Sequence, residues 1–251
     1  MNIQAYLNRI EYRGPLNPDF ETLRQLHLTH LSQVPFENLS IHAHEPIVLK
    51  DAALFEKIVT RRRGGFCYEL NGLFGALLRE LGFEVDMLSA QVANNENGFS
   101  RDFDHMALMV TLERERWLAD VGFGDSFIEP LPLESNNEVQ QRDQRYRIVS
   151  NNQKGLVLER SAKDEGWKPQ YRFSLQRYEY SDYAEMCAYH QTSPESHFTR
   201  QRICSRLTPN GRISLSDLRL IVTEHGARTE RPIQDEGEYA EILRDRFGIV
   251  M

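Results

Sequence analysis

The stretch of sequence that decides the fold is residues 63–71, which reads Arg63-Gly64-Gly65-Phe66-Cys67-Tyr68-Glu69-Leu70-Asn71. From Cys67 onward the apolar residues recur at the spacing of an amphipathic helix, and Gly82 supplies its end. The pattern predicts a helix whose first turn holds Cys67. Unpaired backbone N–H groups and the positive end of the helix dipole favour an anion there. We therefore expect a lowered pKa of the Cys67 thiol and a reactive thiolate.

The glycine pair before Cys67 is typical of a place where a reacting group meets the backbone. Gly64 and Gly65 would let a substrate carbonyl approach the chain closely, and the free N–H groups of the first helical turn would stabilise an oxyanion. The competing interpretation is structural, because free cysteines are commonly buried packing residues. A base near Cys67 would favour the first interpretation.

Composition and charge exclude several classes of function. The chain has 251 residues, 40% of them hydrophobic and 27% charged, and a net charge of -7, which disfavours nucleic acid as a partner. Residues 61–63 form a local arginine cluster, either an anion site or a solvated face. Residues 1–14 lack the apolar run of a signal peptide, and no stretch approaches the ~20 apolar residues of a membrane helix. We expect a cytoplasmic protein.

The cysteines and histidines do not predict a metal site. Cys67, Cys187 and Cys204 are too few and too scattered for a disulfide framework, which favours a reducing compartment. Neither Cys-x-x-Cys nor His-Glu-x-x-His occurs. His27 and His30 lie three residues apart on a predicted helix, and we interpret them as surface or packing residues. We interpret Cys187 and Cys204 as structural.

The period of the apolar residues divides the chain into three regions. Residues 1–82 have helical spacing, with caps expected at Asn2 and Asp51 and a helix that residues 17–19 open. Residues 83–180 alternate like strands and predict an antiparallel sheet or small barrel. Residues 181–251 mix helix and strand. The predicted strands and helices beyond the first region are strands 83–88, 105–112, 117–123, 146–149, 156–159 and 171–175, helix 181–190, hairpin 212–223 and helix 238–247.

His105 is the candidate base, and Asp120 is the candidate group that orients it. His105 opens a strand, Asp120 interrupts the apolar strand 117–123, and a turn near 113–116 brings the two strands together. Their side chains share a face only in some registers, which the sequence does not fix. A buried carboxylate is unfavourable unless it is paired, and the imidazole N–H of His105 would pair it. Alternatively, Asp120 binds backbone locally and His105 merely begins a strand.

Several motifs together resemble one enzyme family. Residues 63–71 closely resemble the nucleophile motif of the arylamine N-acetyltransferases, and residues 34–39 (Val-Pro-Phe-Glu-Asn-Leu) resemble the motif that precedes it. His105-Met106 and residues 120–126 are similar to the two strand motifs of that family. Residues 192–198 resemble its inter-domain segment. The motifs are collinear and span nearly the whole chain.

The resemblance implies an α+β fold and a set of site residues. The fold would have an N-terminal helical bundle (1–82), a central antiparallel β-barrel (83–180) and a C-terminal α/β lid (181–251), with a core similar to that of cysteine proteases. One departure from the family pattern is Asp125, an acidic side chain near the mouth of the pocket, which would either disfavour anionic acceptors or simply be solvated. The implied roles are as follows: a catalytic triad of Cys67, His105 and Asp120; an ionic network of Arg63, Glu37 and Asn38 under the site; an acceptor pocket lined by Phe36, Phe123 and Val92; and a coenzyme A loop containing Gly124 and Ser126.

The resemblance implies acetyl transfer from acetyl-coenzyme A to the nitrogen of an arylamine, arylhydrazine or hydrazide. The reaction would be ping-pong, through acetyl-Cys67, with no metal, nucleic acid or membrane involved and the oligomeric state left open. One alternative keeps the triad with a different acyl donor, as in macrocycle-closing amide synthases or thiol hydrolases. Another is a binding protein that retains the fold without the activity.

Overall fold

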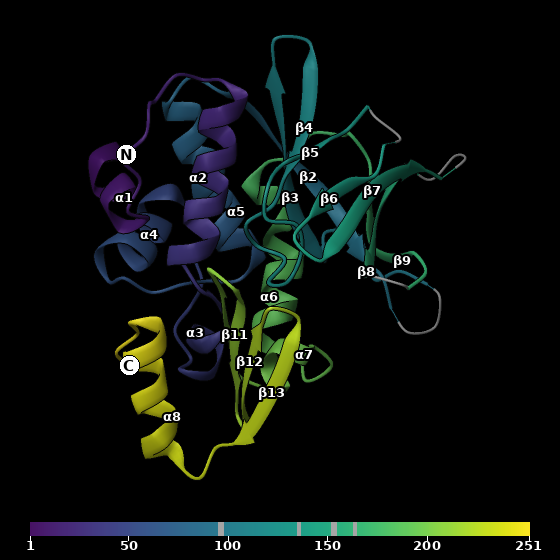
Figure 1. The fold of residues 1–251 in the computed structure, drawn as a ribbon. Helices are drawn as coiled ribbons and strands as arrows, with labels where there is room; N and C mark the ends of the chain where they lie inside the picture. The colour runs from purple at the N-terminus through teal and green to yellow at the C-terminus, as the bar shows by residue number, and fades with distance from the viewer. Residues whose placement is uncertain (95–97, 135–136, 152–154, 163–164) are drawn as a thin grey trace.

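Helices form the N-terminal part of the protein (Figure 1). The computed structural model describes residues 1–94, 98–134, 137–151, 155–162 and 165–251. A π-helical turn, Glu56–Thr60, continues the fourth helix. The N-terminal helices are α1 (Ile3–Arg9), α2 (Phe20–Gln33), α3 (Leu39–His42), α4 (Asp51–Phe55) and α5 (Cys67–Glu80).

One of the two predicted helix caps is confirmed, and so is the predicted start of the second helix. The Asn2 side chain accepts a hydrogen bond from the Ala5 N–H, and the Asp19 side chain accepts one from Thr22. The prediction for Asp51 was wrong: it is the first helical residue of α4, and its carboxylate accepts a hydrogen bond from the Tyr180 hydroxyl. A tertiary partner has therefore replaced the local one.

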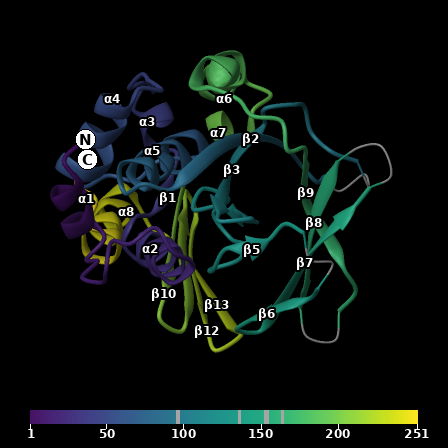
Figure 2. The same cartoon turned by 90° about the horizontal axis from the view of Figure 1, so that it is seen from above.

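The central part of the chain forms an eight-stranded antiparallel sheet that curls into a nearly closed barrel (Figure 2). The strand order is β5-β4-β3-β2-β9-β8-β7-β6, so the chain returns from β9 to pair with β2. The strands are β2 (Glu84–Val92), β3 (His105–Leu112), β4 (Glu115–Ala119), β5 (Leu131–Pro132), β6 (Val139–Gln141), β7 (Gln144–Ser150), β8 (Leu156–Ala162) and β9 (Lys168–Phe173). The predicted barrel is confirmed, although the sequence analysis missed the short strands β5 and β6.

A second antiparallel sheet and three further helices complete the fold. The sheet has the order β1-β10-β11-β12-β13, and its first strand comes from the N-terminal part of the chain. The predicted hairpin 212–223 is confirmed by β11 and β12, whereas β1, β10 and β13 were missed. The elements are β1 (Phe36–Glu37), α6 (Ala184–Thr192), α7 (His197–Arg200), β10 (Ile203–Thr208), β11 (Gly211–Ser216), β12 (Arg219–Glu224), β13 (Ala227–Pro232) and α8 (Glu236–Ile242).

The strand that leads to Asp120 is shorter than the sequence predicted. β4 ends at Ala119, so Asp120 lies just beyond the strand and not within it. The Asp120 N–H donates a hydrogen bond to His27 Nε2, and the Val121 N–H donates one to Asn71 Oδ1. Because these groups no longer point along the sheet, the ladder stops and residues 120–124 turn into the site.

Helix α5 is the buried centre of the molecule. All of its residues from Cys67 to Leu78 are buried, and the helix packs against β2 and β3. The core around it joins the helices to one face of the barrel. This packing fixes the first turn of α5 relative to the start of β3, and hence Cys67 relative to His105. Among the described residues, no helix is both long and apolar enough to span a bilayer.

Candidate active site

Cys67 is the first residue of α5, and close packing of backbone holds it there. The Phe66 N–H donates to the Glu69 carboxylate at 3.2 Å, which ties the first turn of the helix. A Cβ atom at Gly64 would lie 2.0 Å from the Pro35 carbonyl oxygen. We expected the glycine pair to make room for a substrate carbonyl. At Gly64, however, the Pro35 carbonyl of the chain itself occupies that space.

The structure brings His105 and Asp120 into direct contact. His105 Nε2 lies 2.7 Å from Asp120 Oδ2, and both side chains are buried. The register pairs Leu108 with Ala119, and its continuation puts Asp120 on the same face of the sheet as His105. Because an ionised carboxylate only accepts, Nε2 carries the proton of this bond and Nδ1 is left free for another partner.

Asp120 accepts three further hydrogen bonds. Asn71 Nδ2 and the Gly122 N–H donate to Oδ1 at 2.8 and 2.9 Å, and the Tyr171 hydroxyl donates to Oδ2 at 3.0 Å. Burial raises the pKa of this carboxyl, but His105 and the other donors together lower it below its ordinary value. Asp120 is therefore a stable buried anion, oriented at both oxygens.

His27 and Asn71 support Asp120, and the sequence analysis missed both roles. His27 is fully buried; its Nδ1 donates to the Ile128 carbonyl at 2.9 Å and its Nε2 accepts from the Asp120 N–H at 3.1 Å. Burial lowers the pKa of His27, in keeping with the neutral tautomer that these bonds require. Asn71 also binds the Met106 carbonyl and the Val121 N–H. In the sequence, the only indication of a role for Asn71 was its position in the motif at 63–71.

The expected low pKa of the Cys67 thiol is contradicted. Cys67 is 3% exposed, and burial raises the pKa of its thiol well above the ordinary value. A hydrogen bond with the Met106 backbone acts in the opposite direction but does not offset burial. Desolvation is the largest influence on this pKa, so a thiolate at this position needs a cation beside it. A protonated His105 can supply that charge.

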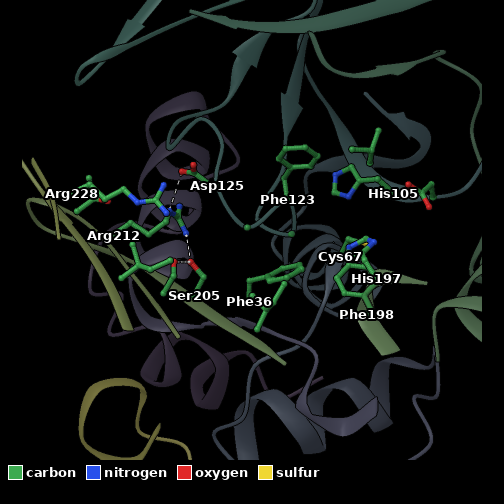
Figure 3. Close-up of a pocket in the computed structure, with 18 residues that line it drawn as sticks. Phe36, Cys67, His105, Phe123, Asp125, His197, Phe198, Ser205, Arg212 and Arg228 are labelled. Atoms are coloured by element: carbon green, nitrogen blue, oxygen red, sulfur yellow. Dashed lines mark hydrogen bonds and ion pairs between the residues drawn. The ribbon is translucent and has the colours of Figure 1, made fainter. Parts of the chain in front are cut away.

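A cavity of about 410 Å³ connects Cys67 and His105 to the C-terminal sheet. Phe36, Phe123 and Val92, the predicted acceptor-pocket residues, all line it. The Phe123 ring packs edge-on against His105, with centroids 5.1 Å apart. Figure 3 shows Cys67, His105, His197 and Phe198 at one end of the cavity, and Asp125, Arg212 and Arg228 at the other.

The predicted coenzyme A residues lie in two different cavities. Gly124 lines the cavity of the thiol and has a φ of 88°, which favours glycine. Ser126 is buried and lines an adjacent cavity of about 250 Å³. Asp125 does face the mouth, but its carboxylate is paired with Arg212 at 3.1 Å and Arg160 at 3.2 Å. The two arginines therefore offset the negative charge through which Asp125 was expected to disfavour anionic acceptors.

An ionic network lies under the nucleophile, with a composition that differs from the prediction. Arg63 is buried and its Nε lies 3.1 Å from Glu37 Oε1. Lys57, which the sequence analysis did not include, binds Glu69 at 2.8 Å and approaches Glu37 at 4.0 Å. Asn38 does not belong to this network. Its side-chain amide binds the backbone of residues 198, 201 and 203 and so connects the start of α3 to α7 and β10.

A second acid–imidazole pair lies beside the same cavity, and its acid lines the cavity. Asp104 lines this cavity directly before His105, and its Oδ1 lies 3.2 Å from Nε2 of the buried His190. His197 also lines the cavity, and its ring lies 6.3 Å from that of His190. None of these three residues was assigned to the site from the sequence: Asp104 adjoins His105 without a pattern of its own, and His190 and His197 are distant in the chain.

Comparisons with known proteins agree with this geometry along the whole chain. A family profile described as N-acetyltransferase matches residues 19–251. An arylamine N-acetyltransferase of Gallus gallus, a pineal gland isozyme, is 31% identical over all of this chain and 95% of its own length. The proansamycin X synthase of Amycolatopsis mediterranei is 30% identical, covering 96% of this chain and 95% of its own.

A solved structure extends the agreement to the fold. The arylamine N-acetyltransferase of Mycobacterium marinum, in complex with CoA, superimposes with a TM-score of 0.92 and is 32% identical, covering 99% of this chain and 93% of its own. Likeness of this extent in sequence and in fold shows that the chain belongs to the arylamine N-acetyltransferase family of acyltransferases, the family that its motifs predicted.

Proposed function

We propose that the protein transfers an acetyl group from acetyl-coenzyme A to the nitrogen of an arylamine, arylhydrazine or hydrazide through acetyl-Cys67. The observation that carries the proposal is the buried 2.7 Å contact between His105 Nε2 and Asp120, because His105 lines the same cavity as Cys67. This contact leaves His105 Nδ1 free to exchange a proton with the thiol. Nucleophile, base and orienting acid then have the roles of a catalytic triad.

In the first half-reaction Cys67 takes the acetyl group. His105 accepts the thiol proton, and the resulting imidazolium is stabilised by Asp120 while it stabilises the thiolate. The thiolate attacks the thioester carbonyl, and backbone N–H groups at the start of α5 stabilise the oxyanion. Coenzyme A leaves as a thiol after taking a proton from His105. The raised pKa of the buried Cys67 thiol means that its deprotonation depends on His105.

In the second half-reaction the acceptor nitrogen attacks acetyl-Cys67. An aromatic amine is uncharged at neutral pH, and its ring would pack against Phe36 and Phe123, which line the cavity. His105 takes the proton that the nitrogen loses and returns it to the sulfur. Gly124 lies on the same cavity wall, where we place the pantetheine arm of coenzyme A, and Ser126 borders the neighbouring cavity.

The proposal is tested by intact mass after brief exposure to acetyl-coenzyme A without an acceptor. We expect the native protein to gain one acetyl group and Cys67→Ala to gain none. Addition of aniline should then discharge the acetyl group and yield acetanilide. Steady-state kinetics should give parallel double-reciprocal lines, and intersecting lines would contradict the ping-pong order.

A second candidate function keeps the triad and changes the acyl donor. It is favoured by the 30% identity to a proansamycin X synthase over nearly the full length of both chains. In that case Cys67 would be acylated by another thioester, and an amine would close on it as an amide. A protein that takes no acetyl group from acetyl-coenzyme A, yet is acylated at Cys67 by other acyl thioesters, would support this alternative.

A further inference from the structure

Asp104 places a carboxylate in the wall of the cavity that contains the nucleophile. It immediately precedes His105, it lines the same cavity as Cys67, and its side chain is 18% exposed. Asp120, in contrast, has a fully buried side chain and contacts His105 directly. Of these two acids only Asp104 lines the cavity, and it has no role in the triad.

His190 holds Asp104 in place. His190 is 2% exposed, and its Nε2 lies 3.2 Å from Asp104 Oδ1 while its Nδ1 lies 3.1 Å from the Ser196 hydroxyl. The rings of Phe66 and Phe198 pack edge-on against the imidazole. The imidazole is thus bound to Ser196 through Nδ1 and lies at ion-pair distance from Asp104 through Nε2, so His190 restrains the position of the carboxylate.

Asp104 remains charged at neutral pH. Burial raises the pKa of its carboxyl, but hydrogen bonds from His190 and Ser100 together lower it below the ordinary value. This negative charge acts against the nucleophile, because Asp104 also contributes to the raised pKa of the Cys67 thiol. The charge therefore opposes the first half-reaction, in which a thiolate must form.

The second half-reaction has the opposite electrostatic demand. The acceptor nitrogen uses its lone pair to form the N–C bond and becomes positively charged before it loses a proton. A fixed carboxylate beside it stabilises this developing charge, and the effect is strongest in a cavity with few water molecules.

We propose that Asp104, positioned by His190, contacts the acceptor amine and stabilises the positive charge on its nitrogen during attack on acetyl-Cys67. This inference rests on the proposed function. The N–C bond forms, the C–S bond breaks with its electron pair going to sulfur, and His105 moves the proton from nitrogen to sulfur. Asp104 takes no proton; it accepts a hydrogen bond from the second N–H of the amine. Asp104 is thus a catalytic residue of the second half-reaction only.

The two half-reactions measured separately on Asp104→Asn test the proposal. Acetylation by acetyl-coenzyme A is followed by rapid quench and intact mass. The acetylated protein is then freed of coenzyme A and mixed with a saturating concentration of aniline, and loss of the acetyl group is timed in the same way. Asp102→Asn is the matched control, since Asp102 is exposed two residues away and binds Gln91.

We expect Asp104→Asn to be acetylated at least as fast as the native protein and to be discharged by aniline roughly 10- to 100-fold more slowly. Asp104→Glu keeps the charge and should be discharged faster than Asp104→Asn. Asp102→Asn should match the native protein in both steps. A residue that only fastens the loop to α6 would give another pattern, with both steps changed by the same factor.

An equal change in both steps, no change in either, or equal discharge of Asp104→Asn and Asp104→Glu would overturn the inference. The failure of the proposed function looks different. If the native protein takes no acetyl group from acetyl-coenzyme A, the proposed function fails and this inference fails with it. If the native protein is acetylated and discharged normally, only the behaviour of the Asp104 variants decides the role of Asp104.

Discussion

Replacing Tyr171 with phenylalanine removes one donor from Asp120 and almost nothing else. The Tyr171 hydroxyl donates to Asp120 Oδ2 at 3.0 Å, and the ring packs between His105 and Phe123 with centroids 5.1 Å from each. The Phe variant keeps this packing and leaves the buried carboxylate with three donors in place of four. A hydrogen bond to a buried charge contributes about 1.5–3 kcal/mol. We expect Tyr171→Phe to lower the free energy of unfolding by that amount.

Tyr183→Phe provides the matched control. Tyr183 is also fully buried, but within the part of the chain that the structure describes its hydroxyl has no hydrogen-bond partner. Its removal should leave the stability unchanged or raise it slightly, because no bond is lost and a buried polar group disappears. Urea denaturation of the three proteins measures the difference, which corresponds to a melting temperature roughly 3–12 °C lower for Tyr171→Phe. Equal stabilities of the two variants would refute the reasoning.

Three further predictions concern the nucleophile, its packing and the buried histidines. His105→Gln should slow alkylation of Cys67 by iodoacetamide at pH 7 at least roughly tenfold, since burial raises the pKa of the thiol; peptide mass mapping measures it, and an unchanged rate would contradict the role of His105. Gly122→Ala should abolish acetylation, because its Cβ would lie 2.8 Å from Cys67 Cα, whereas Gly75→Ala, with its closest contact at 3.4 Å, should leave the acetylation rate unchanged. His30 is buried and its pKa is well below the ordinary value, so the unfolded chain binds a proton near pH 6.5 that the folded chain does not. The part of the stability that depends on His30 should therefore be complete above about pH 6.5 and fall by up to about 1.4 kcal/mol per pH unit below it, and the buried His27 acts in the same direction; unfolding curves at pH 7.5 and 5.5 test this, and equal stability at both would refute it.

The sequence predicted the elements that carry the site better than the contacts within it. Helix α5 follows from the helical spacing of its apolar residues and strand β3 from its apolar run, although the structure buries both elements on every side over most of their length. The register between β3 and β4 cannot be predicted in this way, since the apolar residues of the two strands fit more than one register. The end of β4 at Ala119 depends on His27, which lies 93 residues before Asp120 in the chain. No local sequence pattern indicates a partner that lies so far away in the chain.

The pKa of Cys67 illustrates the same limit for electrostatics. The start of a helix lowers a thiol pKa, and this part of the environment can be predicted from the sequence. Burial acts in the opposite direction and depends on tertiary packing, such as the close approach of Gly122 to the Cys67 backbone. The effect of the helix start can be predicted from the sequence and the effect of burial cannot, so the predicted direction of the pKa shift was wrong. The prediction that Asn38 belongs to the ionic network was wrong for a similar reason, because its partners at residues 198, 201 and 203 are distant in the chain.

The short strand β1 determines how the C-terminal sheet can move. On one side it pairs with β10, through Phe36 opposite Ser205 and Glu37 opposite Cys204. On the other side it forms a bridge with Gly65, two residues before the nucleophile, and the Glu37 N–H donates to the Gly65 carbonyl at 2.8 Å. A continuous run of main-chain hydrogen bonds therefore connects the C-terminal sheet to the loop that carries Cys67.

Main-chain hydrogen bonds on both sides of β1 connect the sheet to the nucleophile loop. We therefore expect the sheet and the loop to move together. The same connection constrains engineering. A chimera that takes its C-terminal sheet from a relative must take residues 36–37 with it, or the donor sheet and the recipient nucleophile loop will no longer share a register.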